Sequence, residues 1–168
     1  MSKWVYQKMS RDKQLVGAAG EYLVLSRLLN LGFLASPAPR GVRKADILVN
    51  HLDGTKLPYL IQVKTRTGLD ADSGWHMGEK NESIKDKDLF YCFVALGEIE
   101  SNIYVIPAEV VARVITESHS IWLNTPGSKG QKHNETSMRK ITNFNKMKVE
   151  SAPNGWMNKY LEKWNQLK

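Results

Sequence analysis

The sequence predicts an α/β protein in which helices and strands alternate along the chain. Three observations support this class: apolar residues at helical spacing over 11–31, two strand-like segments joined by a hairpin signal over 45–65, and a second pair of strands followed by a helix over 89–116. With 168 residues the chain is long enough for a single domain. We expect its core over about 11–118 and an extension over about 124–168.

The first helix is expected over residues 11–31, where Gly32 ends it and a loop follows over 36–41. Its apolar stripe is formed by Ala18, Leu25 and Leu28.

Glu21 lies three residues after Ala18 and four before Leu25, so we expect its carboxylate on this apolar stripe. A carboxylate that faces a core is costly unless it is paired or binds a cation. The preceding GAAG, residues 17–20, predicts a turn that another backbone or a ligand can approach closely.

Two strands are expected over 45–50 and 59–65, joined as an antiparallel hairpin through Asp53-Gly54. Strand side chains alternate between the two faces, so Gln62 and Lys64 share one face. Asp46 stands near the start of the first strand. The hairpin predicts that these polar side chains converge, provided that the register brings them together.

The rest of the chain predicts further elements in order. They are a loop and a short helix near Asn81–Lys87, strands over 89–96 and 102–106, a helix from Pro107 to about Thr116, a basic turn-rich segment over 124–148 and a helix over 154–167. The last helix is favoured by a stripe that we expect to pack on the core: Trp156, Tyr160, Trp164 and Leu167.

The polar residues of the first helix and the hairpin suit metal-assisted hydrolysis of phosphodiesters. Asp46 supplies a hard oxygen ligand for Mg²⁺ or Mn²⁺, and the side-chain oxygen of Gln62 and the backbone carbonyl of Val63 supply others. Glu21 would bind through water or hold a second ion. Lys64 would orient or deprotonate the attacking water, or neutralise charge on phosphorus.

The pattern of Glu21, Asp46 in ADILV and Gln62–Lys64 in IQVK resembles the PD-(D/E)XK nuclease superfamily, also called restriction-endonuclease-like. The resemblance implies an αβββαβ core over about 11–110, with a mixed sheet flanked by helices. It also implies that Asp46 is the aspartate of the motif, Lys64 its lysine and Glu21 the helix acid. Two positions depart from the motif: Ala45 replaces proline, and Gln62 replaces Asp or Glu, which should weaken the metal site.

The charge of the chain fits a polyanionic partner. Lys and Arg outnumber Asp and Glu by 24 to 17, giving a net charge of +7. Five basic residues lie near the motif and are candidates for phosphate contacts: Arg40, Arg43, Lys44, Arg66 and Lys80. A more diffuse basic tract runs from Lys129 to Lys140, either as a contact to DNA backbone or as a loop alone.

We therefore expect a metal-dependent endonuclease acting on nucleic acid, with DNA as the expected substrate. Two other classes remain open. A non-catalytic nucleic-acid-binding module would keep the fold, and a structural protein would use the polar group as an ion-pair network, with Glu21 bridging to Lys64 or Arg43. Among nucleases, a Holliday-junction-resolvase-like dimer is an alternative, and a homodimer in general is left open.

The sequence also predicts a cytoplasmic location. It contains no apolar run long enough to span a membrane and no secretory signal in its first residues. Its only cysteine, Cys92, lies in the apolar segment FYCFVAL, so neither an internal disulfide nor a cysteine-rich metal site is expected.

Overall fold

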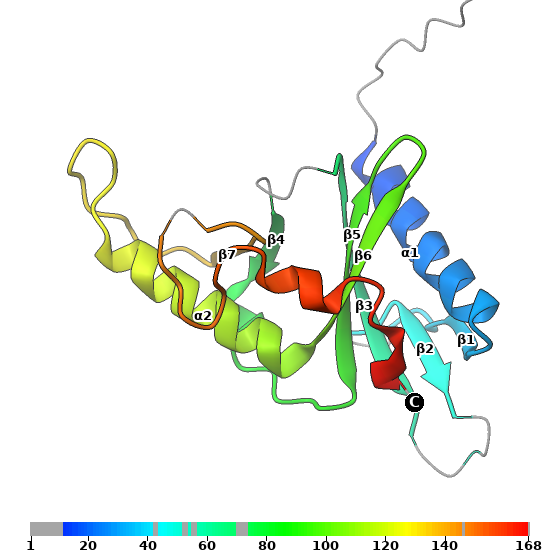
Figure 1. Cartoon of the computed structure of the whole chain (residues 1–168). Coiled ribbons are helices and arrows are strands. Elements are labelled where there is room, and N and C mark those ends of the chain that lie inside the picture. The colour runs from blue at the N-terminus through cyan, green and yellow to red at the C-terminus, as the bar shows by residue number, and fades with distance from the viewer. Residues whose placement is uncertain are drawn as a thin grey trace, which may run out of the picture.

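A five-stranded mixed sheet with a helix on each face forms the centre of the molecule (Figure 1). The computed structural model describes residues 12–41, 44–51, 54, 57–69, 74–145 and 147–167. The sheet has the order β1-β2-β3-β5-β6. Its strands are β1 (Leu34–Pro37), β2 (Ile47–Asn50), β3 (Tyr59–Thr67), β5 (Leu89–Leu96) and β6 (Ser101–Pro107). The expected α/β class, with a mixed sheet flanked by helices, is confirmed.

Only one pair of neighbouring strands in this sheet, β3 and β5, is parallel; the other three pairs are antiparallel. The expected antiparallel pairing of β2 with β3 is present, with Ile47 opposite Ile61, whereas Asp53 of the expected hairpin turn lies outside the described residues. Strand β1 was not expected. It pairs with β2 at the edge of the sheet, and it tolerates Pro37 because an edge strand leaves one row of backbone groups outside the ladder.

Helix α1 (Lys13–Asn30) lies on one face of the sheet and helix α2 (Ala108–Asn124) on the other. The side chain of Asp12 caps α1 by accepting a hydrogen bond from the backbone N–H of Gln14 at 2.7 Å. Helix α2 continues eight residues beyond the expected end at Thr116, and in this extension Ile121 packs against the core on the α2 side.

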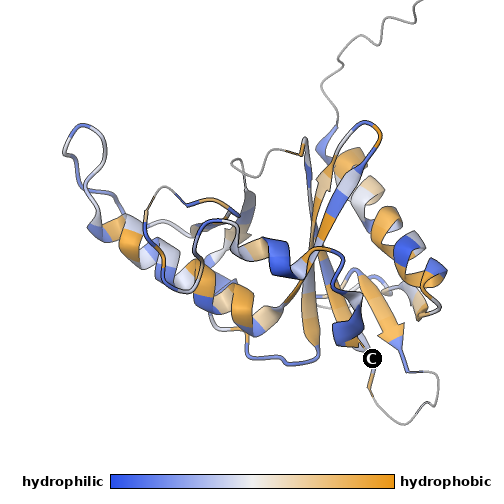
Figure 2. Cartoon of the chain, in the orientation of Figure 1, coloured by the Kyte–Doolittle hydropathy of each residue, from blue (hydrophilic) through white to orange (hydrophobic). Residues whose placement is uncertain are grey.

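Side-chain alternation along β3 and β5 divides the interior into two cores. Ile61, Val63 and Cys92 face α1, whereas Tyr91 and Phe93 face α2. Figure 2 shows the central strands as largely apolar, as expected for strands buried on both faces.

A second, two-stranded sheet pairs β4 (Trp75–Gly78) with β7 (Met138–Ile141). Neither strand was expected, and the helix expected near Asn81–Lys87 is wrong: the structure has a 3-10 helix, η2 (Glu79–Asn81), followed by turns. The link between β3 and β5 therefore contains a strand in place of the helix that an αβββαβ core implies. The partner of β4 lies about sixty residues later in the chain, so local patterning carries no signal for it.

The C-terminal segment crosses the outer edge of β6 instead of forming one helix. It consists of the 3-10 helices η3 (Trp156–Tyr160) and η4 (Trp164–Leu167). Between them, Leu161 forms an antiparallel bridge with Tyr104, and Glu162 takes a positive φ of 49°, a conformation that interrupts a helix. Trp156 packs in the core on the α2 side and Trp164 in the core on the α1 side.

The expectation of a continuous helix over 154–167 is thus wrong, although three of the four stripe residues are buried as expected: Trp156, Trp164 and Leu167. Covering the β6 edge pairs two of its free backbone carbonyls: the N–H of Glu162 donates to the carbonyl of Ile103 at 2.9 Å, and Gln166 Nε2 donates to the carbonyl of Val105 at 3.0 Å. Among the residues placed by the structure, no helix is long and apolar enough to cross a membrane.

Candidate active site

The site lies at the N-terminal end of β2, where the pairing of β2 with β3 stops. Asp46 stands just before β2; its backbone N–H donates to the carbonyl of Ile61 at 2.8 Å. Its Oδ2 accepts a hydrogen bond from the backbone N–H of Val63 at 2.7 Å. Extending the β2–β3 register by one residue places Asp46 opposite Gln62. Beyond this point the β2 ladder stops, and among the described residues no strand pairs with this edge of β3 from Val63 onwards.

Gln62 and Lys64 lie on the same face of β3, as expected. They alternate with Ile61 and Val63, which are buried toward α1. Across the parallel ladder Gln62 lies beside Tyr91 and Lys64 beside Phe93, and both aromatic residues belong to the core on the α2 side. Both side chains are half-buried, as is Asp46. The structure therefore brings Asp46, Gln62 and Lys64 to one corner of the sheet.

Glu21 reaches this corner from α1, but not from the position that we expected. The buried stripe of α1 is Gly20, Val24 and Leu28, and Glu21 is exposed beside it. The expectation that Glu21 faces the core is wrong because the helix is rotated so that Gly20 rests on Thr65 of β3. A Cβ on Gly20 would overlap the Thr65 side chain, so only glycine allows this close approach.

The GAAG segment at 17–20 is accordingly part of α1 and not a turn. The segment was expected to allow close approach by another backbone or a ligand; at Gly20 the close approach is made by the side chain of Thr65, which brings α1 against β3. This contact sets the position of the next residue, Glu21, relative to the β3 edge.

The charges of Glu21, Asp46 and Lys64 influence one another. Desolvation by the surrounding protein raises the pKa of Glu21, negative Asp46 raises it further, and Lys64 opposes both. Burial lowers the pKa of Lys64, and nearby Lys80 lowers it too, whereas Asp46 and Glu21 raise it. Within the described chain, Lys64 nevertheless forms no direct ion pair: the ion pairs there involve Arg27, His119 and Arg139.

The donor set fits a hard divalent cation with few protein carboxylates. Asp46 has one oxygen fixed by Val63, which orients the carboxylate toward the open edge of β3. In an extended strand the N–H and C=O of one residue point the same way, so the Val63 carbonyl points to this edge as well. No group of three or more His, Cys, Asp or Glu side chains suited to a metal occurs in the part of the chain that the structure describes. Any ion here would rely on amide, carbonyl and water oxygens beside two carboxylates.

The expected phosphate-binding residues are placed in different ways. Arg40 and Lys44 are exposed on the segment leading to Asp46, and Lys44 has a positive φ of 71°. The guanidinium of Arg66 lies over the ring of Trp75, 4.6 Å from its centroid. Arg43 lies outside the described residues.

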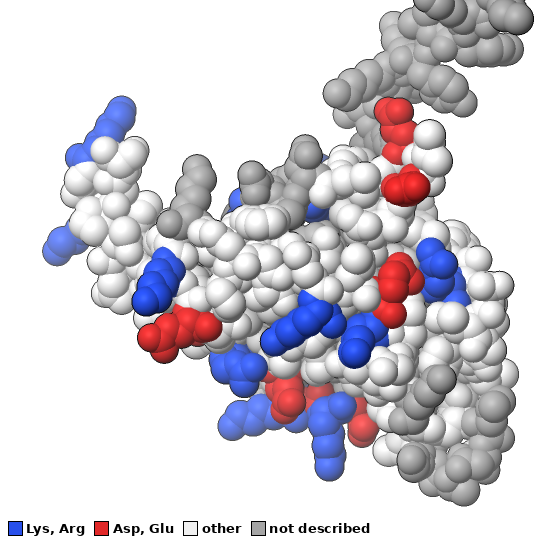
Figure 3. All heavy atoms as spheres, in the orientation of Figure 1, with Lys and Arg blue, Asp and Glu red and all other residues white. Residues whose placement is uncertain are grey.

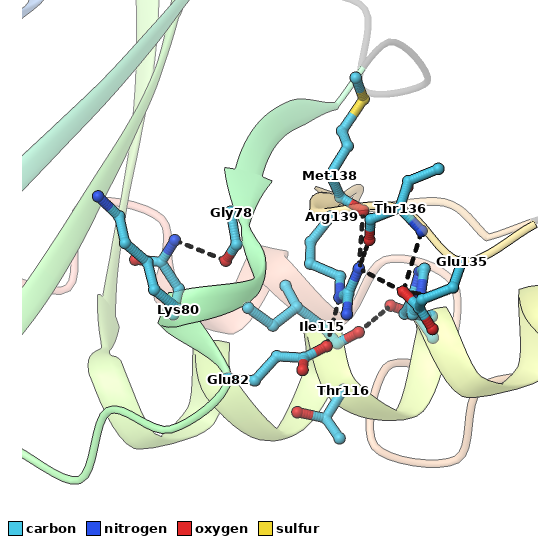
Figure 4. Close-up of polar contacts among 12 residues, drawn as sticks. Gly78, Lys80, Glu82, Ile115, Thr116, Glu135, Thr136, Met138 and Arg139 are labelled. Atoms are coloured by element: carbon cyan, nitrogen blue, oxygen red, sulfur yellow. Dashed lines mark hydrogen bonds and ion pairs between the residues drawn. The ribbon is translucent and has the colours of Figure 1, made fainter.

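Lys80 is held near the site by a turn that the sequence did not reveal. Asn81 is buried; its Nδ2 donates to the carbonyl of Gly78 at 2.8 Å, and its Oδ1 accepts from the hydroxyl of Tyr91 at 2.8 Å. Burial raises the pKa of Tyr91 to about 12, so this hydroxyl stays a donor at neutral pH. Figure 4 shows the Lys80 side chain pointing away from Arg139 and the acidic residues that hold it, Glu82 and Glu135.

The basic tract after α2 does not form one surface. The Arg139 side chain is only 6% exposed and is held by Glu82, Glu135 and the carbonyls of Thr136 and Met138 (Figure 4). The other basic residues of the tract are exposed or half-exposed: Lys129, Lys132, His133 and Lys140. Figure 3 shows basic and acidic side chains scattered over the visible face, not gathered into one patch.

The geometry thus defines a mixed α/β protein with two carboxylates, an amide and a lysine at one corner of its sheet. No protein-family model matches the chain, and no curated relative matches it significantly. Among solved structures it is similar to a bacterial homing endonuclease, I-Ssp6803I, with 16% sequence identity, a TM-score of 0.48 and 92% of each chain covered. A likeness of this size assigns neither a family nor a site.

Proposed function

We propose that this protein is a metal-dependent nuclease of the PD-(D/E)XK kind that hydrolyses phosphodiester bonds, with DNA as the expected substrate. One observation carries the proposal. Asp46 is fixed by the Val63 amide opposite Gln62, at the open edge of β3, and shares its electrostatic environment with Lys64 and Glu21. An ordinary half-exposed sheet face needs neither the second acid nor a lysine whose pKa is lowered.

Four groups of this chain would hold a divalent ion, Mg²⁺ or Mn²⁺: the carboxylates of Asp46 and Glu21, the side-chain oxygen of Gln62 and the carbonyl of Val63. The ion supplies polarisation of the phosphate and a lower pKa for bound water. Asp46 and Glu21 also raise the local negative charge. Desolvation and the negative charge of Asp46 disfavour the ionised form of Glu21, as its raised pKa indicates.

Lys64 would act on the attacking water or on the charge that develops on phosphorus. Because burial lowers its pKa, Lys64 releases a proton more readily than an exposed lysine does. Arg40, Lys44, Arg66 and Lys80 would hold the phosphates of the substrate, together with Arg43. Trp75 fixes the direction of Arg66 by stacking under its guanidinium.

The decisive test is cleavage by the wild-type chain and by Asp46→Asn. Plasmid DNA and labelled duplex, single-stranded and branched DNA, with an RNA of matched sequence, are incubated with Mg²⁺, Mn²⁺ or a chelator. We expect metal-dependent cleavage by the wild type, little by Asp46→Asn and full activity in Glu98→Gln, a matched change on the exposed β5–β6 turn. A wild type that cuts equally well with the chelator would refute the metal assignment.

A second candidate function is nucleic-acid binding without catalysis. The observation that favours it is the donor set, which has only two carboxylates because Gln62 replaces an acid. This candidate takes over if the wild type binds these nucleic acids but cuts none of them in either metal.

A further inference from the structure

Helix α1 carries a second apolar stripe, on the side that does not face the sheet. Leu15 is 70% exposed, Tyr22 69% and Leu29 51%. At 100° per residue these three positions cluster roughly opposite Gly20, Val24 and Leu28, which face the sheet. Figure 2 likewise shows apolar colouring on α1 that is not confined to its sheet-facing side.

The spacing of this stripe is that of a helix-pairing seam. Its exposed members are seven residues apart, the spacing of one position of a heptad; between them Ala18 and Leu25 are half-buried, and Leu25 packs against the core on the α1 side. A helix that packs only on a sheet needs one apolar face, so the first stripe does not account for the second.

The stripe is also complementary to itself. Leu15 and Leu29 lie at equal distances on either side of Tyr22, and no charged residue lies within the stripe. If a second α1 runs antiparallel across it, Tyr22 meets Tyr22 and Leu15 meets Leu29. A two-fold symmetric interface requires this kind of self-matching surface.

We propose that a second copy of this chain covers the stripe, so that the protein forms a symmetric dimer through antiparallel α1 helices. An exposed patch of these three side chains is on the order of 400 Å², within the range of the largest apolar patches on monomers. Two copies would bury roughly 800 Å² in total, which is the size of a weak, transient interface and not of a stable one. The dimer should therefore dissociate on dilution.

Edge-to-edge pairing of sheets is a poorer route to the dimer. The edge strand β1 has only four residues and includes Pro37, and the β6 edge is covered by the C-terminal segment. The inference does not depend on the proposed nuclease function. Because Glu21 is adjacent to Tyr22 on α1, the dimer would place the two candidate sites on either side of its two-fold axis.

The experiment measures the mass of the full chain by analytical ultracentrifugation over a concentration series. We expect a wild-type mass that rises toward twice 19.1 kDa with concentration. Leu15→Glu with Leu29→Glu should remain at one chain throughout. Ile99→Glu is the matched control, because Ile99 is 97% exposed on a turn far from α1 in sequence, and it should behave as the wild type. Circular dichroism checks that each variant is folded.

Cysteine cross-linking tests the direction of the helices, because the native Cys92 is fully buried. Tyr22→Cys should form a disulfide-linked dimer on oxidation. Leu15→Cys alone should not, since an antiparallel pair sets the two copies of residue 15 about 21 Å apart. A mixture of Leu15→Cys and Leu29→Cys chains should cross-link to each other.

Cross-linking of Leu15→Cys to itself, without Tyr22→Cys dimers, would overturn the antiparallel arrangement. A wild type that stays at one chain at every concentration would overturn the proposal as a whole. In that case, loss of thermal stability in Tyr22→Lys would point to another segment of the same chain, such as residues 1–11, as the cover. Cleavage activity enters none of these outcomes, so the dimer can fail while the proposed function stands.

Discussion

The carboxylate of Asp46 accepts a hydrogen bond from the backbone N–H of Val63 at 2.7 Å, which joins the start of β2 to the middle of β3. This contact takes the place of a regular backbone bond at the point where the β2 ladder stops. It fixes the acid beside Gln62 and leaves its other oxygen for a ligand.

The first prediction concerns metal affinity. Asp46→Asn keeps an oxygen that can accept from Val63 but loses the charge, so divalent binding should fall at least tenfold while the fold is retained. Gln62→Glu should tighten binding because it restores the missing carboxylate. Calorimetric titration of Mg²⁺ and Mn²⁺ into each protein measures both effects. Equal affinities in the three proteins would contradict the ligand assignment.

The second prediction separates catalysis from binding. Lys64→Ala should lower the cleavage rate by about 10²–10⁴-fold, the usual cost of losing one positioned group. DNA affinity should change little, because Lys64 is one of 24 basic residues and phosphate binding is spread over many contacts. Rates come from single-turnover cleavage and affinities from a salt titration, with Lys163→Ala as a surface control. Normal cleavage by Lys64→Ala would remove its assigned role.

The third prediction is a pH dependence of stability. Glu21 has a raised pKa, above the ordinary 4.5, so its contribution to folding is most favourable at acid pH and is lost as pH rises through the folded-state pKa. Glu21→Gln should therefore stabilise the protein at pH 7, by less than about 1 kcal/mol because solvent screens the group. Near pH 3.5 the gain should vanish.

Glu117 provides the opposite control. Hydrogen bonds from Ser151, assisted by the backbone of Glu150, lower the pKa of Glu117. Its contribution is present at neutral pH and is lost on acidification, so Glu117→Gln should destabilise at pH 7. Urea unfolding at several pH values follows both variants. A destabilising Glu21→Gln at pH 7 would show that its carboxylate has a favourable partner in the fold.

The fourth prediction tests the contact between α1 and β3. Gly20→Ala should destabilise the protein by about 1–3 kcal/mol, because the new Cβ overlaps the side chain of Thr65. Gly17→Ala is the matched control in the same helix. Nothing lies within 4 Å of its new Cβ, so it should be neutral or stabilising by about 0.5–1 kcal/mol. Thermal unfolding distinguishes the two, and a stable Gly20→Ala would mean that α1 can shift away from β3.

The sequence by itself determined the elements whose patterns are local. Helical spacing located α1, the Asp53-Gly54 signal paired β2 with β3, and unbroken apolar runs located β5 and β6. The alternation of β3 also placed Gln62 and Lys64 on one face, because that property depends only on strand geometry. The proposed chemistry of the site rests on these residues.

Only the tertiary structure decided the features that depend on distant partners. The pairing of β4 with β7, the ion pair of Arg139 with Glu82 and the path of the C-terminal segment over β6 each join residues far apart in the chain. The rotation of α1 about its own axis is likewise decided by a residue that is distant in the sequence. Two apolar stripes lie on that helix, and local spacing does not choose between them; the fit of Gly20 against Thr65 selects the stripe that is buried and places Glu21 at its border.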